Sequence, residues 1–441
     1  MKGDFTRDTF DAGKHFSRVF MQQGRVALDA DHNEQTAILL RYMRMLARDI
    51  IGPYAATAGA DGGFLLAMDA NNDFTISKGR YYVDGILVEN DTDNCTYKHQ
   101  PDFPVPADDA LSVALAEKAK ANHSFLIYLD VWERHITPIE DDSIREKALG
   151  GPDTCTRAKV VWQVKARRTK LATRGPDQKT QLENHLSKLV RISSAWLAAR
   201  VDPGVQTEGP CMVPPSAGFT GLENHLYRVE IHRGGAADEA TFKWSRDNGS
   251  VATAWLDVNG NDLQVTSTRG FIPRNWVELS DDHSDLLGKP GTLMQLVKVE
   301  GDSLSVESAK TLPTIGNFPA NSKVRRWDHI ATDAISLADD NALPIQESPT
   351  TAGQVVWIDL EDGVQIQFSA GGEYRTGDYW LIPARAITRD IEWPHDGQSN
   401  PRQLPPHGIE HHYALLGFVG PGQKLESIRC EFSPVMRLKK K

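Results

Sequence analysis

The clearest pattern of apolar positions in the chain is a helical stripe near its beginning. Between about Asp31 and Ile51, apolar side chains recur every three or four residues, at Leu39, Met43, Leu46 and Ile50. This spacing places them on one face of an α-helix. The sequence therefore predicts an amphipathic helix that docks through this face, either against the chain's own β domain or against a neighbouring subunit.

Signals for both ends of this helix flank the stripe. Asp29 or Asp31 provides the N-cap, because a short acidic side chain accepts hydrogen bonds from the first backbone N–H groups of a helix. Gly52 and Pro53 stop the helix. A short β-prone segment precedes it and turns at Gly24.

After the helix, the pattern changes to short alternating runs bounded by Gly, Asn, Asp and Pro. Residues 74–90 predict a hairpin, since Asp84 and Gly85 supply the positive φ angles of a tight turn. A short helix is expected over residues 107–121. The fold class is therefore predicted to be mainly β, with antiparallel sandwiches or barrel-like units, the N-terminal amphipathic helix and one or two helical insertions (α+β).

A chain of 441 residues is long enough for several packed units. A second helical stretch is predicted between 177 and 201 from the apolar positions Leu182, Leu186, Leu189 and Val190. We expect five segments: a turn-and-helix docking unit over 1–53, a β domain with a short helix over 54–170, a helical insertion over 171–202, a β domain over 203–325 and a C-terminal β domain over 326–441.

Charge and cysteine usage exclude several classes of protein. The net charge is −10, and a nucleic-acid partner is not expected because phosphate binding requires clustered Lys and Arg. No apolar run reaches the roughly 18 residues of a membrane span, and no secretory leader is recognised, so we expect synthesis and assembly in the cytoplasm. The cysteines lie far apart without a C-x-x-C pair, and we expect reduced thiols at Cys95, Cys155, Cys211 and Cys430.

The most suggestive chemical motif is H-x-x-E-H, spelled by residues 407–411. A zinc hydrolase needs both histidines one turn apart on a helix. Pro406 and Gly408 disfavour that helix, so a loop-to-strand junction is predicted here, with a non-catalytic metal site as the weaker alternative. The candidate metal ligands for that alternative are His407, His411 and His412.

Three further patterns have simpler interpretations than catalysis or ligand binding. Residues 69–73 and 257–261 imitate the start of a calcium loop, but Asn and Asp also close ordinary turns. The acidic residues of 140–146 are typical of the first turn of a helix. Abundant tryptophan could form a sugar-binding platform, yet it is more often core, at Trp132, Trp162, Trp244, Trp255, Trp276, Trp327, Trp357, Trp380 and Trp393.

The opening residues, MKGDFTRDTFDAGKHFSRVFMQQGRVALDADHNEQT, resemble those of a bacterial family of uncharacterised proteins encoded beside phage-tail-like, contractile-injection genes. The resemblance continues through YYVDGILVEN, LENHLYRVEIHRGG, TFKWSRDNGSV and HGIEHHYALLGFV, and so covers most of the chain. It carries no catalytic residues over.

A looser resemblance concerns the region from Phe16 to Ile51 and the hairpin after it. This region is similar to the N-terminal end of some phage tail-fibre and baseplate proteins, which docks the fibre to the particle. The matching positions are Phe16, Val19, Gly24, Asn33 and Glu34. The long repetitive shaft and receptor-binding tip of a fibre are missing, which favours an adaptor, baseplate or tail-associated part.

The sequence therefore predicts a structural or docking component of a phage-tail-like contractile particle rather than an enzyme. Its expected partners are other subunits of that particle and further copies of the same chain, in a ring or a trimer. No cofactor is expected, and release of the particle outside the cell is compatible with the role. The alternative is a glycan-binding surface module, and a hydrolase is the less favoured third interpretation.

Overall fold

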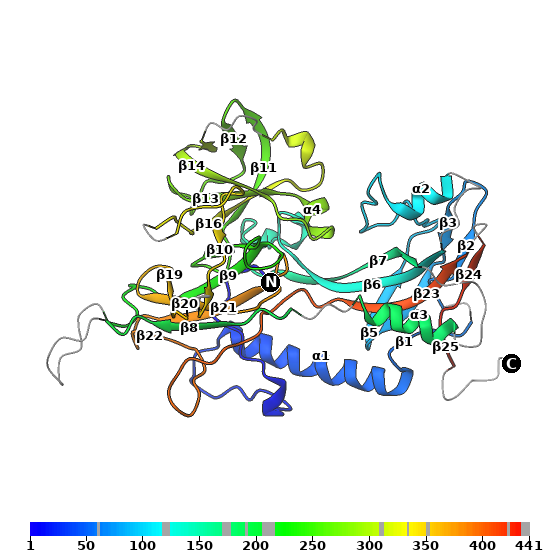
Figure 1. The fold of residues 1–441 in the computed structure, drawn as a ribbon, viewed down its shortest axis with the longest axis horizontal. Coiled ribbons are helices and arrows are strands. Elements are labelled where there is room, and N and C mark those ends of the chain that lie inside the picture. Colours follow the sequence, from blue (N-terminus) through cyan, green and yellow to red (C-terminus); the bar gives the residue numbers. More distant parts are fainter. Residues whose placement is uncertain are drawn as a thin grey trace.

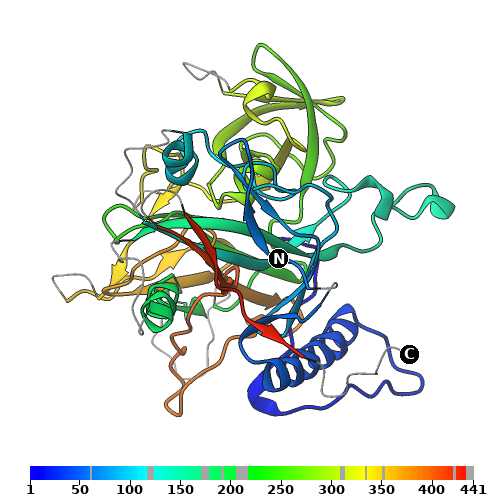
Figure 2. The same cartoon turned by 90° about the vertical axis from the view of Figure 1, so that its right-hand side faces the viewer.

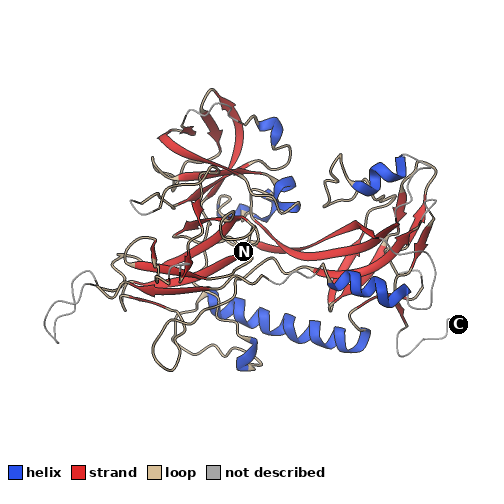
Figure 3. Cartoon of the chain, in the orientation of Figure 1, coloured by secondary structure: helices blue, strands red, loops and turns tan. Residues whose placement is uncertain are grey.

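The computed structural model describes residues 1–59, 62–116, 124–169, 178–189, 193–204, 217–307, 313–332, 335–349, 353–420 and 424–433. Three β units meet at a central junction, and a long helix, α1 (Asp29–Ile51), runs along one edge of the molecule (Figure 1). Strands predominate over helices throughout (Figure 3). The predicted mainly β fold with an N-terminal helix is confirmed.

The first sandwich combines strands from both ends of the chain. One layer has the strand order β25-β1-β4-β5 with the pair β2-β3 beside it, and the other has the order β24-β23-β6-β7. The layers share one core, to which Tyr81 and Leu416 belong. The strands are β1 (Tyr54–Thr57), β2 (Leu66–Met68), β3 (Phe74–Ile76), β4 (Gly79–Val83), β5 (Ile86–Asn90), β6 (Ser124–Ile136), β7 (Arg157–Thr169), β23 (His412–Val419), β24 (Leu425–Ser427) and β25 (Glu431–Phe432).

The second sandwich has one layer in the order β17-β10-β9-β21-β22 and another in which β18, β19 and β8 contact β20. Both layers enclose a core that includes Tyr227, Trp244 and Phe368. The strands are β8 (Leu197–Val201), β9 (His225–Arg233), β10 (Thr241–Ser245), β17 (Leu343–Pro344), β18 (Glu347–Ser348), β19 (Ile358–Asp359), β20 (Val364–Ser369), β21 (Tyr379–Arg385) and β22 (Asp390–Ile391).

A closed barrel with the order β11-β12-β15-β14-β13-β16 is inserted between β10 and β17 of the second sandwich. Closure leaves this sheet without free edges. Its interior is filled by apolar side chains such as Leu263, Val277 and Leu304. The strands are β11 (Ala252–Asn259), β12 (Asp262–Val265), β13 (Trp276–Ser280), β14 (Thr292–Glu300), β15 (Ser303–Val306) and β16 (Lys323–Trp327).

The remaining helices are short, and among the described residues no helix is long and apolar enough to cross a membrane. They are α2 (Ala110–Ala116), α3 (Gln178–Ser187), α4 (Asp282–Leu286) and the 3-10 turns η1 (Ala12–Lys14), η2 (Asp142–Ile144), η3 (Lys147–Leu149) and η4 (Ile315–Asn317). The short helix predicted over 107–121 corresponds to α2, and residues 117–123 lie outside the described part.

The second predicted helix ends earlier than expected. Leu182 and Leu186 are buried on α3 as predicted, whereas Val190 lies outside the described residues. Residues 197–201 form strand β8, which pairs antiparallel with β20. The prediction of helix up to 201 was wrong. Because β8 is buried, its apolar residues form a continuous run without the alternation of apolar and polar residues that distinguishes a strand from a helix.

The ends of α1 and the following hairpin were predicted with one error. Leu28 occupies the N-cap position without a side-chain hydrogen bond, so neither Asp29 nor Asp31 is the cap. Asp29 is instead the first helical residue. The tight turn between β4 and β5 is confirmed, since Asp84 and Gly85 have φ angles of 47° and 82°.

Predicted segments and observed units are organised differently. Segment 326–441 supplies β17–β22 to the second sandwich and β23–β25 to the first. Segment 203–325 supplies β9 and β10 to the second sandwich and β11–β15 to the barrel. Strand β25 pairs in parallel with β1 across most of the chain length. Pairing over such distances leaves no trace in the local pattern of residues.

Candidate functional site: an apolar helix face and a charged junction

Two ion pairs and one close backbone contact fasten α1 to the first sandwich. Arg44 Nη2 lies 2.8 Å from Glu133 Oε1, and Arg48 Nε lies 3.5 Å from Asp84 Oδ1. Gly85 lies directly against the helix, because a Cβ atom added there would come within 2.0 Å of the carbonyl oxygen of Arg44. These contacts seat the second half of α1 on the β4–β5 hairpin.

The N-terminal segment fastens the first half of α1. The backbone N–H of Thr6 donates to Asp29 Oδ2 at 2.9 Å, and the Thr6 hydroxyl donates to Asp29 Oδ1 at 2.5 Å. The Thr9 hydroxyl donates to Glu34 Oε2 at 2.6 Å. Polar contacts therefore hold both halves of α1 in a defined position. Apolar burial contributes little, because among the described residues Ile38 is the single large apolar side chain of α1 that is buried.

The side of α1 that faces away from these contacts is apolar and uncovered. We call it the apolar face, and its side chains and their exposed fractions are Leu39 (52%), Leu40 (41%), Tyr42 (68%), Met43 (64%), Leu46 (50%) and Ile50 (64%). All four positions predicted as a docking stripe belong to it. The described β units of the chain leave these four side chains exposed. Of the two docking partners predicted from the sequence, the described part of the chain's own β domain is therefore excluded, and a neighbouring subunit remains.

Two members of the apolar face, Leu40 and Tyr42, lie outside the stripe predicted from the sequence. That stripe follows only the spacing of three and four residues. Plotting every residue at 100° per position would have placed both side chains beside the stripe. Nearby, the N-terminal segment exposes Phe16 (58%) and Phe20 (70%), and Arg18 lies over the Phe20 ring at 4.3 Å.

The three β units meet around a dense set of buried ion pairs. Lys243 of β10 lies 2.5 Å from Glu278 of β13 and 3.5 Å from Glu230 of β9. Arg228 also pairs with Glu230, at 2.6 Å. Burial alone would raise the pKa of Glu230, but Lys2, Arg228 and Lys243 outweigh it and lower the pKa to about 2. The carboxylates therefore stay charged, and the network joins the second sandwich to the barrel.

A cavity of about 320 Å³ lies at this junction and is lined by all three units. The N-terminal segment enters it: Lys2 Nζ lies 2.9 Å from Glu230 Oε1, and Asn248 Nδ2 donates to the carbonyl oxygens of Met1 and Gly3 at 3.1 and 2.8 Å. The same segment that holds the start of α1 therefore also fills part of the junction. The position of α1 is coupled to the packing of the three units.

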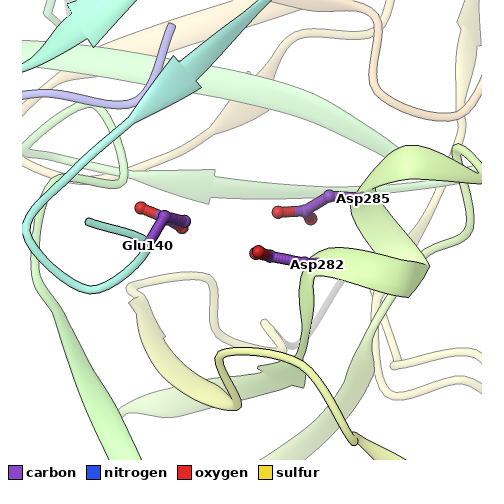
Figure 4. Close-up of side chains that lie close together, drawn as sticks. All are labelled: Glu140, Asp282 and Asp285. Atoms are coloured by element: carbon purple, nitrogen blue, oxygen red, sulfur yellow. The ribbon is translucent and has the colours of Figure 1, made fainter. Parts of the chain in front are cut away.

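Three carboxylates at the junction come close enough to suggest a metal site. Glu140 lies opposite Asp282 and Asp285 of α4, with ligand oxygens within 4.8 Å of one another (Figure 4). However, Lys323 Nζ lies 2.7 Å from Glu140 Oε1 and 2.6 Å from Asp285 Oδ2, and Arg134 Nη2 lies 2.5 Å from Asp282 Oδ1. A divalent cation would have to displace these basic groups, so the cluster is better described as an internal ion-pair network.

Burial of neutral histidines at the junction predicts a loss of stability in mild acid. Burial and nearby cations lower the pKa of His135 to about 3 and that of His232 to about 4, and burial lowers the pKa of His329 to about 3. The unfolded chain takes up these protons below pH 6.5, whereas the folded chain does not. Burial raises the pKa of Asp378 to about 6, which opposes the effect by one proton.

Burial, followed by Arg228, also lowers the pKa of the Met1 amine to about 4, so we expect the free energy of unfolding to fall by roughly 5 kcal/mol between pH 6.5 and pH 5. A further loss is expected below about pH 4.5, where acids with a lowered pKa such as Glu230 become protonated on unfolding. Urea unfolding followed by tryptophan fluorescence at several pH values measures this change. A midpoint that stays constant from pH 7 to pH 5 would show that the buried histidines are not neutral in the folded chain.

The structure does not bring the predicted histidine ligands together. The His407 ring packs against Tyr379, His411 Nδ1 lies 2.7 Å from Asp130 Oδ1, and His412 Nδ1 lies 3.0 Å from Asp84 Oδ2. Residues 407–411 contain no helix, and β23 begins at His412. This is the loop-to-strand junction expected from Pro406 and Gly408.

The other candidate motifs take their simpler interpretations. Asp69 Oδ1 accepts hydrogen bonds from the backbone N–H groups of Asn71 and Asp73, which closes a turn. Residues 257–261 lie at the β11–β12 hairpin, and residues 140–146 lead into η2 and η3. Of the nine tryptophans named above, eight are buried, and Arg200 covers the ring of the ninth, Trp357, at 3.9 Å.

The chain belongs to DUF6519, a family of unknown function, whose model matches residues 1–174 and 178–441. The match therefore extends over all three β units and over α1. Neither a curated protein nor a solved structure matches the chain.

Proposed function

We propose that the chain is a structural docking component of a phage-tail-like contractile particle, in the position of a baseplate, adaptor or tail-associated protein. The observation that carries this proposal is the uncovered apolar face of α1. Soluble proteins rarely leave a contiguous apolar patch of several hundred square ångströms in water, and such patches mark sites of protein association. The proposed role of the face is to bury itself against another subunit.

The way α1 is held supports this role. Hydrogen bonds from Thr6 and Thr9, the ion pair between Arg44 and Glu133 and the seat on Gly85 fix the helix before any partner arrives. A surface that is already ordered loses little conformational entropy on binding, so more of the apolar contact energy appears as affinity. We propose a phage-tail-like particle as the assembly because this region resembles the docking end of tail-fibre and baseplate proteins.

The two alternatives receive less support from the described residues. The buried acids at the junction are paired, and the pKa of Glu140 is lowered to about 2 because Lys323 outweighs the effect of burial, whereas a general acid requires a raised pKa. The buried tryptophans contribute to cores, whereas a sugar platform requires exposed rings. No second function is proposed.

The proposal predicts that the chain copurifies with tail-like particles of the organism that encodes it. Particles are isolated by density-gradient centrifugation from cells that carry an epitope-tagged copy, and fractions are probed for the tag together with sheath and tube proteins. The tagged chain is expected to peak with the intact particle. Recovery in the free-protein fractions alone, while sheath and tube sediment normally, contradicts the proposal.

A further inference from the structure

We infer that the apolar face of α1 packs against the same face in other copies of this chain, as a bundle of three α1 helices. The inference rests on the proposed docking role, since it names the partner that covers the face. Helix α1 lies at the edge of the molecule in both views, with the β units on its other side (Figures 1 and 2). The six side chains of the face are 41–68% exposed, so further copies have access to them.

The spacing of the apolar side chains on one α1 helix is complementary to the same spacing on a second α1 helix. Leu39, Met43, Leu46 and Ile50 follow one another at intervals of four, three and four residues, which is the alternation of the two core positions in a heptad repeat. In such a repeat, each apolar side chain inserts between four side chains of a facing helix that has the same spacing. A second α1 helix supplies that spacing.

The width of the face favours three helices over two. With 100° between successive residues, Tyr42 marks one edge of the face and Leu40 marks the other. The arc between these two edges spans about 160° of the helix circumference. In two-stranded coiled coils the apolar seam is narrow, and charged residues commonly flank it. Here Leu40 and Tyr42 stand at the flanking positions, so each helix has apolar surface for two neighbours.

The size of the face meets the requirement of a specific interface. Taking about 200 Å² for a large side chain, the exposed fractions of its six members leave on the order of 700 Å² uncovered. A standard-size interface takes roughly 800 Å² from each partner. In a bundle of three, each copy divides its area between two neighbours, and the whole assembly buries on the order of 2,100 Å², which is the total area of a stable complex.

The arginines of α1 do not oppose self-association. Arg41, Arg44 and Arg48 project from the side of the helix opposite the apolar face, because they lie within about 40° of the direction diametrically opposed to Leu39. Two of them are already paired, with Glu133 and Asp84. Three helices that meet through their apolar faces therefore keep these basic groups apart.

The inference is tested by the mass of the purified full chain in solution. Light scattering on a size-exclusion column is expected to give three times the chain mass of 48.9 kDa at micromolar concentration. Leu46→Glu places a charge in the centre of the bundle and is expected to give a folded monomer, since Leu46 is half exposed in the single chain; its thermal midpoint falls only by the amount that association contributes. Met45→Glu, at an apolar position of α1 that is 47% exposed and lies about 120° from Leu39 around the helix, outside the face, is the matched control and is expected to remain trimeric.

A second measurement locates the contact. In a Cys155→Ser background, which removes an exposed thiol, Ala47→Cys beside the face is expected to crosslink between copies with a short bis-maleimide, and Arg41→Cys on the opposite side is not. Mass spectrometry assigns the linked positions. A monomeric wild-type chain, or a trimer that Leu46→Glu leaves intact, overturns the inference. Particle copurification is scored separately, so a monomer that still copurifies refutes self-association and leaves the proposed function standing.

Discussion

Replacing Lys243 by methionine is expected to lower the free energy of unfolding by about 3–5 kcal/mol, because it leaves the buried carboxylate of Glu278 without its cation, whereas Glu230 keeps Lys2 and Arg228. The Lys243 side chain is 2% exposed, pairs with Glu230 and Glu278, and lies 4.3 Å from the centre of the Trp327 ring. Urea unfolding monitored by tryptophan fluorescence follows the effect at the junction itself. The first unfolding transition is expected to move to markedly lower urea concentration.

Two controls give this prediction its specificity. Lys298→Met removes a lysine of the exposed pair with Glu300 and is expected to leave the free energy of unfolding almost unchanged, because solvent screens this pair. Adding Glu278→Gln to Lys243→Met is expected to recover part of the loss, because it removes the uncompensated charge while keeping an acceptor for Trp327 Nε1. If the Lys243 and Lys298 variants are equally stable, the ion pairs do not hold the units together.

Replacing Gly85 by alanine is expected to displace α1 and to destabilise the chain by more than about 3 kcal/mol. The positive φ of 82° accounts for about 1–2 kcal/mol, and the rest arises because the new methyl group would overlap the backbone of Arg44. The helix must then move off the β4–β5 hairpin. Trypsin is therefore expected to cut at Arg41 and Arg48 faster than in the wild type.

Gly150→Ala is the matched control for this change. Gly150 has a similar φ of 90°, but a Cβ atom there meets no other atom within 4 Å. It is expected to show the φ penalty without faster cleavage of α1. Equal destabilisation and equal cleavage in the two variants would mean that Gly85 does not seat the helix.

Elements with a local signature were predictable from the sequence. The stripe of α1 and the Asp84–Gly85 turn depend on residues within a few positions of each other, so periodicity and turn chemistry suffice. The N-cap was not predictable, because Thr6 engages Asp29 from 23 positions away. Strand β8 was taken for helix because burial removed its alternation.

The junction was not predictable, for a different physical reason. Its ion pairs join residues far apart along the chain, such as Glu140 with Lys323 and Lys2 with Glu230. A charged residue within a strand, such as Lys243 or Glu278, has the same appearance in the sequence as a solvent-exposed one. Phe242 and Trp244 flank Lys243 on its strand, which is the alternation of a strand with one solvent-exposed face, so no local signal marked this charge as buried.

The central claim is that another protein subunit buries the apolar face of α1. A cryo-EM map of isolated tail-like particles from the organism that encodes the chain tests it most directly. We expect density for the three β units and for α1, with Leu39, Met43, Leu46 and Ile50 inside a protein–protein contact. A map in which the chain is present but this face of α1 points into solvent would contradict the claim.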